Sequence, residues 1–193
     1  MTYVKKKLPE ITETLPSFRS HPGPMETGRV IRSGAVCDVC QRTRGTIYYG
    51  PIKSDLNEIS ICPWCIADGS AKQEFEIEFF SSWDIPVNDL KIVEEVCART
   101  PDYISLQGEH WFTHCNDAIV YMGQMPVDGL LRVEPKAVKA FEKEPTFGGG
   151  SFRSDNLASR IYELNQLTTN NGPQAYLFQC LHCGIYTTFL DMD

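Results

Sequence analysis

The chain has 193 residues and a formal net charge of -7, with 42% hydrophobic and 22% charged residues. This composition is typical of a soluble globular protein that is large enough to form its own core, and it predicts a single compact unit over 1–193. The negative balance argues against general binding to the phosphate backbone of nucleic acid and favours a basic partner.

The N-terminal residues MTYVKKK are basic, but no apolar segment follows them, so they do not resemble a secretory signal. No apolar run approaches the roughly 18 residues that span a bilayer, which predicts a protein without membrane-spanning helices. We therefore expect a cytoplasmic protein, in which thiols stay reduced. Its 8 cysteines are then expected to be free thiols or metal ligands rather than a disulfide scaffold.

The first third of the chain contains little helical pattern. Residues 1–30 are rich in Pro, Gly, Ser and Thr, which predicts an irregular segment laid over a core. The stretches 46–52 and 58–64 have strand-like composition and are separated by a turn sequence, so we expect them to pair as a hairpin. The following stretch, 66–80, is expected to begin as a helix, although Gly69 leaves its boundary open.

The second half predicts a mixed body over 85–193. The apolar periodicity of 87–97 predicts an amphipathic helix that ends before Pro101. The segment 110–123 is expected to be a turn that leads into a short helix. Further helices are expected over 135–144 and 157–167, and 175–193 is expected to form a hairpin of two strands around a CxxC pair. These elements predict an α+β fold rather than a regular βαβ fold.

Three CxxC pairs are the strongest chemical signal: Cys37/Cys40, Cys62/Cys65 and Cys180/Cys183. Two-residue spacing lets both sulfurs of a tight turn point at one ion, and tetrahedral zinc needs four such donors. The first two pairs are close enough in sequence to share one ion, and the second pair precedes a predicted helix. We therefore expect one structural zinc site in a zinc-ribbon or treble-clef-like module over 35–75.

The first two pairs have two other interpretations. The CPWC sequence before a helix is also typical of thioredoxin-type redox dithiols, and reduced cysteines can simply fill a core. Thioredoxin-type motifs require a βαβ context that this chain does not predict, whereas a matched second pair lies nearby. Structural zinc is therefore favoured. Four thiolates leave no open coordination position, so such an ion would stabilise the fold and do no chemistry.

The third pair needs partners from elsewhere in the chain. The nearest donors lie in the sequence HWFTHC, and we expect a second zinc site made of Cys180, Cys183, Cys115 and His114. Adjacent residues do not naturally point the same way, which weakens His114 and Cys115 as joint ligands. His110 is therefore an alternative ligand, because it would share a helical face with His114.

Three further residues have alternative roles. Cys115 lies beside His114 and Asp117, which invites a Cys-His-Asp nucleophile, but catalytic partners usually meet through folding rather than through adjacency. Cys97 lies on the amphipathic helix and is expected to be a small core residue. His182 lies inside the third CxxC pair and is expected to point outward.

The combined motifs resemble those of the CbrC family of bacterial proteins, and the resemblance covers nearly the whole chain from near residue 15. The matching pieces are LPSFRSHPGPMETG, CDVCQRTRGTIYYGP, CPWCIADGSAKQEF, ARTPDY, HWFTHCNDA and YLFQCLHCGIYTTFLDMD. This resemblance implies a cytoplasmic zinc-binding protein without established enzymatic activity, from a family that is tied to colicin tolerance and looks like toxin immunity proteins. It places the family's cysteine motifs on the three CxxC pairs and its HC pair on His114 and Cys115.

These observations favour a noncatalytic zinc-binding protein that acts in tolerance of, or immunity to, a colicin-like toxin by covering a basic surface of that toxin. A zinc-finger regulator that contacts nucleic acid is a second hypothesis, motivated by Arg42 and Arg44 beside the first CxxC pair. A hydrolase is a third, in which the C-terminal site has only three protein ligands and activates water.

Overall fold

The computed structural model describes residues 9–11, 13–52, 59–81, 85, 87, 89–105, 111–126 and 174–191. In chain order its elements are β1 (Val30–Arg32), β2 (Thr46–Tyr48), α1 (Pro63–Ala67), α2 (Ser70–Phe75), α3 (Leu90–Arg99), β3 (Thr113–His114), β4 (Asp117–Ala118), β5 (Val120–Pro126), β6 (Gln174–Gln179) and β7 (Tyr186–Asp191). This mixture of short helices and small antiparallel sheets confirms the predicted α+β class. Among the described residues, no helix is long and apolar enough to cross a membrane.

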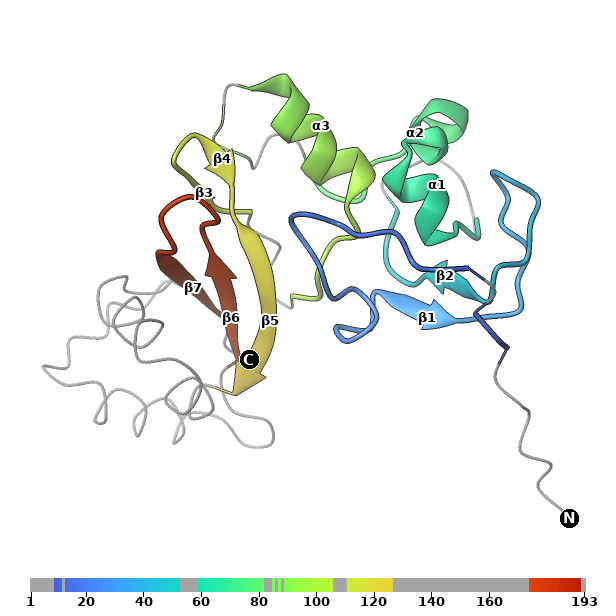
Figure 1. The fold of residues 1–193 in the computed structure, drawn as a ribbon, viewed down its shortest axis with the longest axis horizontal. Coiled ribbons are helices and arrows are strands. Elements are labelled where there is room, and N and C mark those ends of the chain that lie inside the picture. The colour runs from blue at the N-terminus through green and yellow to red at the C-terminus, as the bar shows by residue number, and fades with distance from the viewer. Residues whose placement is uncertain are drawn as a thin grey trace, which may run out of the picture.

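Figure 1 shows the three-stranded sheet β5-β6-β7 at one end of the molecule and the β1–β2 ribbon with α1 and α2 at the other. Helix α3 lies between these two ends. Each end has its own apolar core: Ile61, Ile66 and Phe79 belong to the first, and Trp111 and Phe178 to the second. The module over 35–75 and the body over 85–193 stay a prediction.

The N-terminal end differs from its predicted pairing. Strand β2 pairs with β1, with Ile31 opposite Ile47, and not with 58–64. Residues 59–62 have no strand assignment and contribute one bond to β2, from the Tyr48 N–H to the Ile61 carbonyl at 2.7 Å. The predicted hairpin was therefore wrong. The physical reason is that Cys62 is the N-cap of α1 and Pro63 is its first residue, so the chain turns into a helix before a second strand can extend.

The helices follow the predicted signals in part. The helix expected to begin within 66–80 is two short helices, α1 and α2, which are separated at Gly69. Helix α1 already begins at Pro63, and α2 ends at Phe75, so 76–80 are not helical. Gly69 has a φ of 81°, a left-handed conformation that glycine adopts without steric cost. Helix α3 confirms the amphipathic helix: the Asp89 side chain caps it by accepting from the Lys91 N–H at 2.9 Å, and it ends at Arg99, just before Pro101.

The remaining predictions of secondary structure had different outcomes. The turn and short helix expected at 110–123 were wrong, because residues from Thr113 onward form the β3–β4 hairpin and then strand β5. The hairpin around the last CxxC pair was confirmed, since β6 and β7 pair in register from Gln174–Asp191 to Gln179–Tyr186. Residues 9–11 and 13–29 contain neither helix nor strand, as predicted. The helices expected over 135–144 and 157–167 lie outside the described residues.

A buried polar network joins the two ends. The Asp102 carboxylate is fully buried, pairs with the Arg29 guanidinium at 2.9 Å and accepts a hydrogen bond from the Tyr48 hydroxyl at 2.7 Å. Nearby, the His21 ring contacts the Pro101 carbonyl through Nδ1 at 2.8 Å. The HPGP and ARTPDY sequences are therefore in direct contact, and together they hold the two cysteine-bearing ends in one arrangement.

Candidate metal centres

The first CxxC pair lies on a tight turn between β1 and β2. The Cys37 N–H donates to the Arg42 carbonyl at 3.0 Å, and the Gln41 N–H donates back to the Cys37 carbonyl at 2.8 Å. Gln41 adopts a left-handed φ of 56°, which closes the turn just after Cys40. This loop geometry directs the two cysteine side chains toward the same point.

The second pair lies at the N-terminus of α1. Cys62 caps the helix with an extended backbone, and the Cys65 N–H donates to the Cys62 carbonyl at 3.1 Å. The Cys62 N–H also donates to the Cys37 sulfur at 3.3 Å, so the helix start and the first turn are already in contact. A cysteine turn that faces a helix N-terminus is the arrangement of a treble-clef-like finger.

The four sulfurs form a compact cluster, which we call the N-terminal cluster (Cys37, Cys40, Cys62, Cys65). Three of the Sγ–Sγ separations are 3.9 Å for Cys37–Cys65, 3.8 Å for Cys40–Cys62 and 3.6 Å for Cys62–Cys65, and all four sulfurs lie within 4.8 Å of one another. Four sulfurs at the corners of a tetrahedron, each about 2.3 Å from a central zinc ion, lie about 3.8 Å apart. The spacing of the sulfurs therefore fits a tetrahedral metal ion.

The electrostatics of the N-terminal cluster favour a thiolate at Cys37 and the protonated thiol at Cys62. A hydrogen bond from the Cys62 thiol lowers the pKa of Cys37 to about 4, although burial opposes this shift. The same hydrogen bond, together with burial, raises the pKa of Cys62. One sulfur thus carries negative charge while a neighbour holds the proton, and a divalent cation would replace such shared protons with a stronger positive charge.

The third CxxC pair repeats the backbone pattern of the first. The Cys180 N–H donates to the Ile185 carbonyl at 2.9 Å, and the Gly184 N–H donates to the Cys180 carbonyl at 2.9 Å. Gly184 has a φ of 69° and occupies the position that Gln41 occupies in the first turn. Two segments far apart in the sequence therefore form the same cysteine turn.

The partners of the third pair come from the β3–β4 hairpin. His114 pairs with Asp117 across it, and the two turn residues, Cys115 and Asn116, have φ values of 53° and 57°. Positive φ at both central residues is the signature of a tight hairpin turn. Because Cys115 adopts this left-handed conformation, its sulfur lies 3.2 Å from Nδ1 of the adjacent His114. The left-handed backbone at Cys115 therefore lets two adjacent residues, His114 and Cys115, direct their donor atoms to the same point.

These side chains form the C-terminal cluster (His114, Cys115, Cys180, Cys183), whose ligand atoms all lie within 4.8 Å of one another. His114 Nδ1 lies 3.3 Å from the Cys183 sulfur. For zinc bound to nitrogen at about 2.05 Å and sulfur at about 2.3 Å, a tetrahedral site places these atoms about 3.5 Å apart. The C-terminal cluster therefore also fits a four-coordinate ion.

The remaining candidates lie elsewhere. Cys97 is 1% exposed in the core, and its carbonyl accepts from the Phe79 N–H at 2.7 Å, so it belongs to neither cluster. This confirms its expected role as a core residue. His182 is exposed, as expected, and its Nε2 contacts the Asp117 carboxylate at 2.8 Å. His110, the alternative ligand, lies outside the described residues.

An ion-pair network beside the C-terminal cluster was not predicted from the sequence. The Arg19 guanidinium pairs with both Asp117 and Glu95, at 2.7 Å and 2.9 Å. Although burial opposes the shift, hydrogen bonds from Arg19 and His182 lower the pKa of Asp117. Asp117 is directed to these cations, which weakens the Cys-His-Asp nucleophile interpretation. The position of Arg19 beside the HPGP sequence was the only signal that could have indicated its role.

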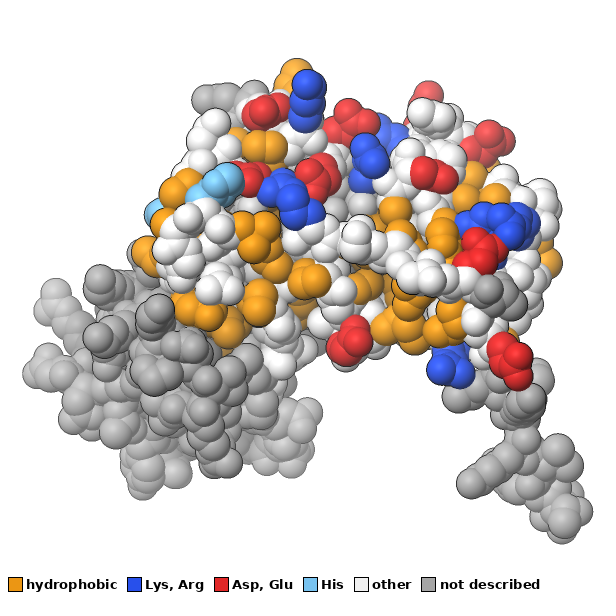
Figure 2. All heavy atoms as spheres, viewed as in Figure 1, with side chains coloured by type: hydrophobic (Ala, Val, Ile, Leu, Met, Phe, Trp, Pro, Cys, Tyr) orange, Lys and Arg blue, Asp and Glu red, His pale blue; other side chains and the backbone are white. Residues whose placement is uncertain are grey.

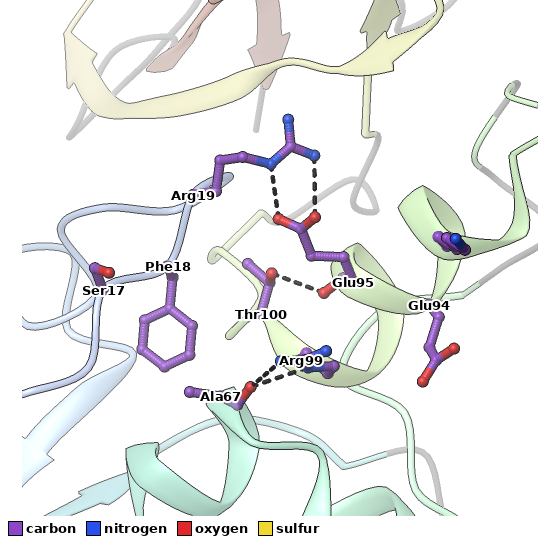
Figure 3. A pocket seen from close by; sticks show the side chains of 9 residues that line it. Ser17, Phe18, Arg19, Ala67, Glu94, Glu95, Arg99 and Thr100 are labelled. Carbon is purple, nitrogen blue, oxygen red and sulfur yellow. Dashed lines mark hydrogen bonds and ion pairs between the residues drawn. The ribbon is translucent and has the colours of Figure 1, made fainter.

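A cleft of about 460 Å³ lies between the two ends and is drawn in Figure 3. It is lined by Ser17, Phe18, Arg19, Ala67, Lys91, Glu94, Glu95, Arg99 and Thr100. Its charged side chains are largely engaged with the protein itself: Arg19 pairs with Glu95, and Arg99 donates two bonds to the Ala67 carbonyl, at 2.7 and 2.9 Å. No residue of either cluster lines this cleft.

The molecule is thus an α+β protein with two four-donor, cysteine-rich clusters that could each hold a metal ion. The chain belongs to the uncharacterised protein family UPF0167, whose model matches residues 15–192. Curated relatives include a UPF0167 protein of Mycobacterium bovis, 35% identical over 184 residues (93% of this chain and 94% of the relative). Another, from Pseudomonas aeruginosa, is 35% identical over 176 residues (88% and 93%). No solved structure matches the chain.

Proposed function

We propose that this chain is a noncatalytic zinc protein in which two closed sites hold a binding scaffold together. The observation that carries the proposal is the spacing of the N-terminal cluster, in which three Sγ–Sγ separations of 3.6 to 3.9 Å match those around tetrahedral zinc. The mixed nitrogen and sulfur donors of the C-terminal cluster also suit zinc. Metal analysis of the purified chain tests the proposal, and two zinc ions per chain are expected.

The number of ligands supports the proposed noncatalytic role. A catalytic zinc keeps one position open for water or substrate, whereas each cluster supplies four protein ligands. Among the described residues, the cleft of about 460 Å³ is lined by residues of neither cluster. This arrangement supports a structural role for both ions and counts against the hydrolase hypothesis.

The partner that we propose is a protein toxin of colicin-like type, met in the cytoplasm and bound through its basic surface. The support is the net charge of -7 together with the resemblance of the motifs to the CbrC family. Exposed carboxylates of Asp68, Glu74 and Glu76 lie on the side of α1 and α2, and Figure 2 shows acidic side chains mixed with basic ones over this face. Charges of this kind would accelerate encounter with a basic partner and cover its surface.

A binding experiment tests the toxin proposal. The purified full chain is titrated against a toxin domain encoded next to its gene, and the same pair is expressed together in cells. We expect measurable affinity and protection from killing. Glu74→Lys should slow association, while Glu26→Lys, with the same change in net charge at an exposed position outside α1 and α2, should leave it nearly unchanged. The absence of both affinity and protection would contradict the proposal.

The two arginines that motivated the nucleic-acid hypothesis, Arg42 and Arg44, interact with other residues of the protein. Arg42 and Arg44 both pair with the Glu13 carboxylate, and the Arg44 guanidinium lies over the Trp64 ring at 5.0 Å from its centroid. Cations that are neutralised within the protein contribute less to a phosphate-binding surface. A salt-dependent mobility shift with DNA or RNA would nevertheless restore this alternative.

A further inference from the structure

The two clusters differ in their exposure to solvent. In the N-terminal cluster, Cys37, Cys62 and Cys65 are no more than 3% exposed. In the C-terminal cluster, by contrast, Cys115 and Cys183 are both exposed, and only Cys180 is buried. A small oxidant dissolved in water can therefore reach two sulfurs of the C-terminal cluster, whereas the N-terminal cluster offers it at most the partly buried Cys40.

The two exposed sulfurs are close to one another but come from different parts of the chain. Cys115 lies in the β3–β4 turn and Cys183 in the turn between β6 and β7. Both sulfurs contact the same atom, His114 Nδ1, at 3.2 and 3.3 Å. Since they lie within 4.8 Å, an approach of less than about 3 Å would bring them to the bonding distance of a disulfide.

We propose that Cys115 and Cys183 form an oxidation site for hydrogen peroxide or another hydroperoxide, and that their disulfide releases the C-terminal ion while the N-terminal ion stays bound. The inference rests on the proposed zinc occupancy of the C-terminal cluster. It assigns to this cluster a chemistry that the N-terminal cluster does not share.

The reaction balances with the peroxide as its only oxidant. One exposed thiolate attacks a peroxide oxygen, so an S–O bond forms, the O–O bond breaks and the leaving hydroxide takes a proton to become water. The second thiolate then attacks the sulfenic sulfur, so an S–S bond forms and the S–O bond breaks, with a second water as product. Two thiol sulfurs lose two electrons in total, and one peroxide is reduced to two waters.

Loss of the ion follows from the donors that remain. After oxidation the C-terminal cluster retains only the His114 nitrogen and the Cys180 sulfur, and two donors are too few for tight zinc binding. The hairpin would still be held by the Asp117–Arg19 ion pair at 2.7 Å, which does not involve sulfur. We therefore expect the oxidised chain to stay folded.

The test uses the full zinc-loaded chain and dilute hydrogen peroxide. Released zinc is followed with a colour-forming chelator, and disulfides are mapped by mass spectrometry after the remaining thiols are alkylated. We expect release of one of the two ions, a Cys115–Cys183 disulfide, an unchanged far-ultraviolet circular dichroism spectrum and reversal by a dithiol reductant with added zinc. Release of both ions, release of none, or a Cys180–Cys183 disulfide would overturn the inference.

Two variants sharpen the test. Cys115→His still offers a metal donor but has no sulfur for the disulfide, so peroxide-driven release should slow by more than about tenfold. Cys97→Ala removes a buried thiol outside the cluster and should behave like the wild type. Should Cys115→His fail to bind a second ion, the disulfide map of the wild type decides alone. Metal content measured before peroxide is added tests zinc occupancy separately, so failure of the proposed function is distinguished from failure of this inference.

Discussion

The Nδ1 atom of His114 lies 3.3 Å from the Cys183 sulfur, although 69 residues separate the two in the sequence. This contact joins the β3–β4 hairpin to the turn between β6 and β7, and it makes His114 the single nitrogen donor of the C-terminal cluster. His114→Ala should remove one zinc per chain and leave the N-terminal ion bound. His114→Cys, which restores a fourth donor, should recover the second ion. Zinc content by mass spectrometry under native conditions checks both variants.

The N-terminal cluster should be essential to the fold around it. Cys62 caps α1 and supplies one of four sulfurs, so Cys62→Ser is expected to release the first zinc and unfold at least residues 35–75, because zinc binding and folding are coupled. Hydrogen exchange of the purified variant measures the extent of unfolding. Unchanged metal content and unchanged protection in this region would show that Cys62 is no ligand.

Cys97 provides the matched comparison, since it is equally buried but lies outside both clusters. Cys97→Ala should lower the free energy of unfolding by only about 1 kcal/mol, the usual cost of a small truncation in a core. Both zinc ions should remain. Chemical denaturation together with metal analysis tests this expectation, and the loss of one metal equivalent would mean that Cys97 is a ligand.

The buried Arg29–Asp102 pair should matter more than any surface pair. Its side chains are 8% and 0% exposed, and Asp102 also accepts from Tyr48 at 2.7 Å. Arg29→Met leaves a buried carboxylate without its cation and should cost about 3–5 kcal/mol of stability. Arg42→Met breaks an exposed pair with Glu13 and should cost about 0–1 kcal/mol. Similar losses in the two variants would contradict this ranking.

Buried His21 should make the fold sensitive to acid. Burial lowers the pKa of its imidazole from 6.5 to about 4, so the unfolded chain binds a proton more readily than the folded one between these values. Stability should therefore fall as the pH drops from about 6.5 toward 4, by up to about 3 kcal/mol from this group. His21→Gln, which cannot titrate, should show a flatter stability profile than the wild type over this range. Parallel profiles would mean that folding does not lower the pKa of His21.

The candidate metal ligands were easier to predict from the sequence than the pairing of the strands. Two-residue spacing is a local property, so it indicated the three CxxC pairs directly, whereas His114 and Cys115 were predicted as the nearest further donors and from the family resemblance. The predicted hairpin of 46–52 with 58–64 was wrong. The prediction relied on the short turn between the two stretches and did not recognise that Cys62 and Pro63 begin a helix. The left-handed φ of Cys115 and the ion pairs of Arg19 depend on contacts between distant segments, which no local pattern reveals.

X-ray absorption at the zinc edge, combined with a zinc count, tests the central claim most directly. The account predicts two zinc ions per chain, with four sulfurs around one ion and three sulfurs and one nitrogen around the other. Cadmium substitution, read by the sulfur-to-cadmium absorption band, gives an independent count of thiolates. Fewer than two ions, or an oxygen ligand from bound water at either ion, would contradict two closed structural sites.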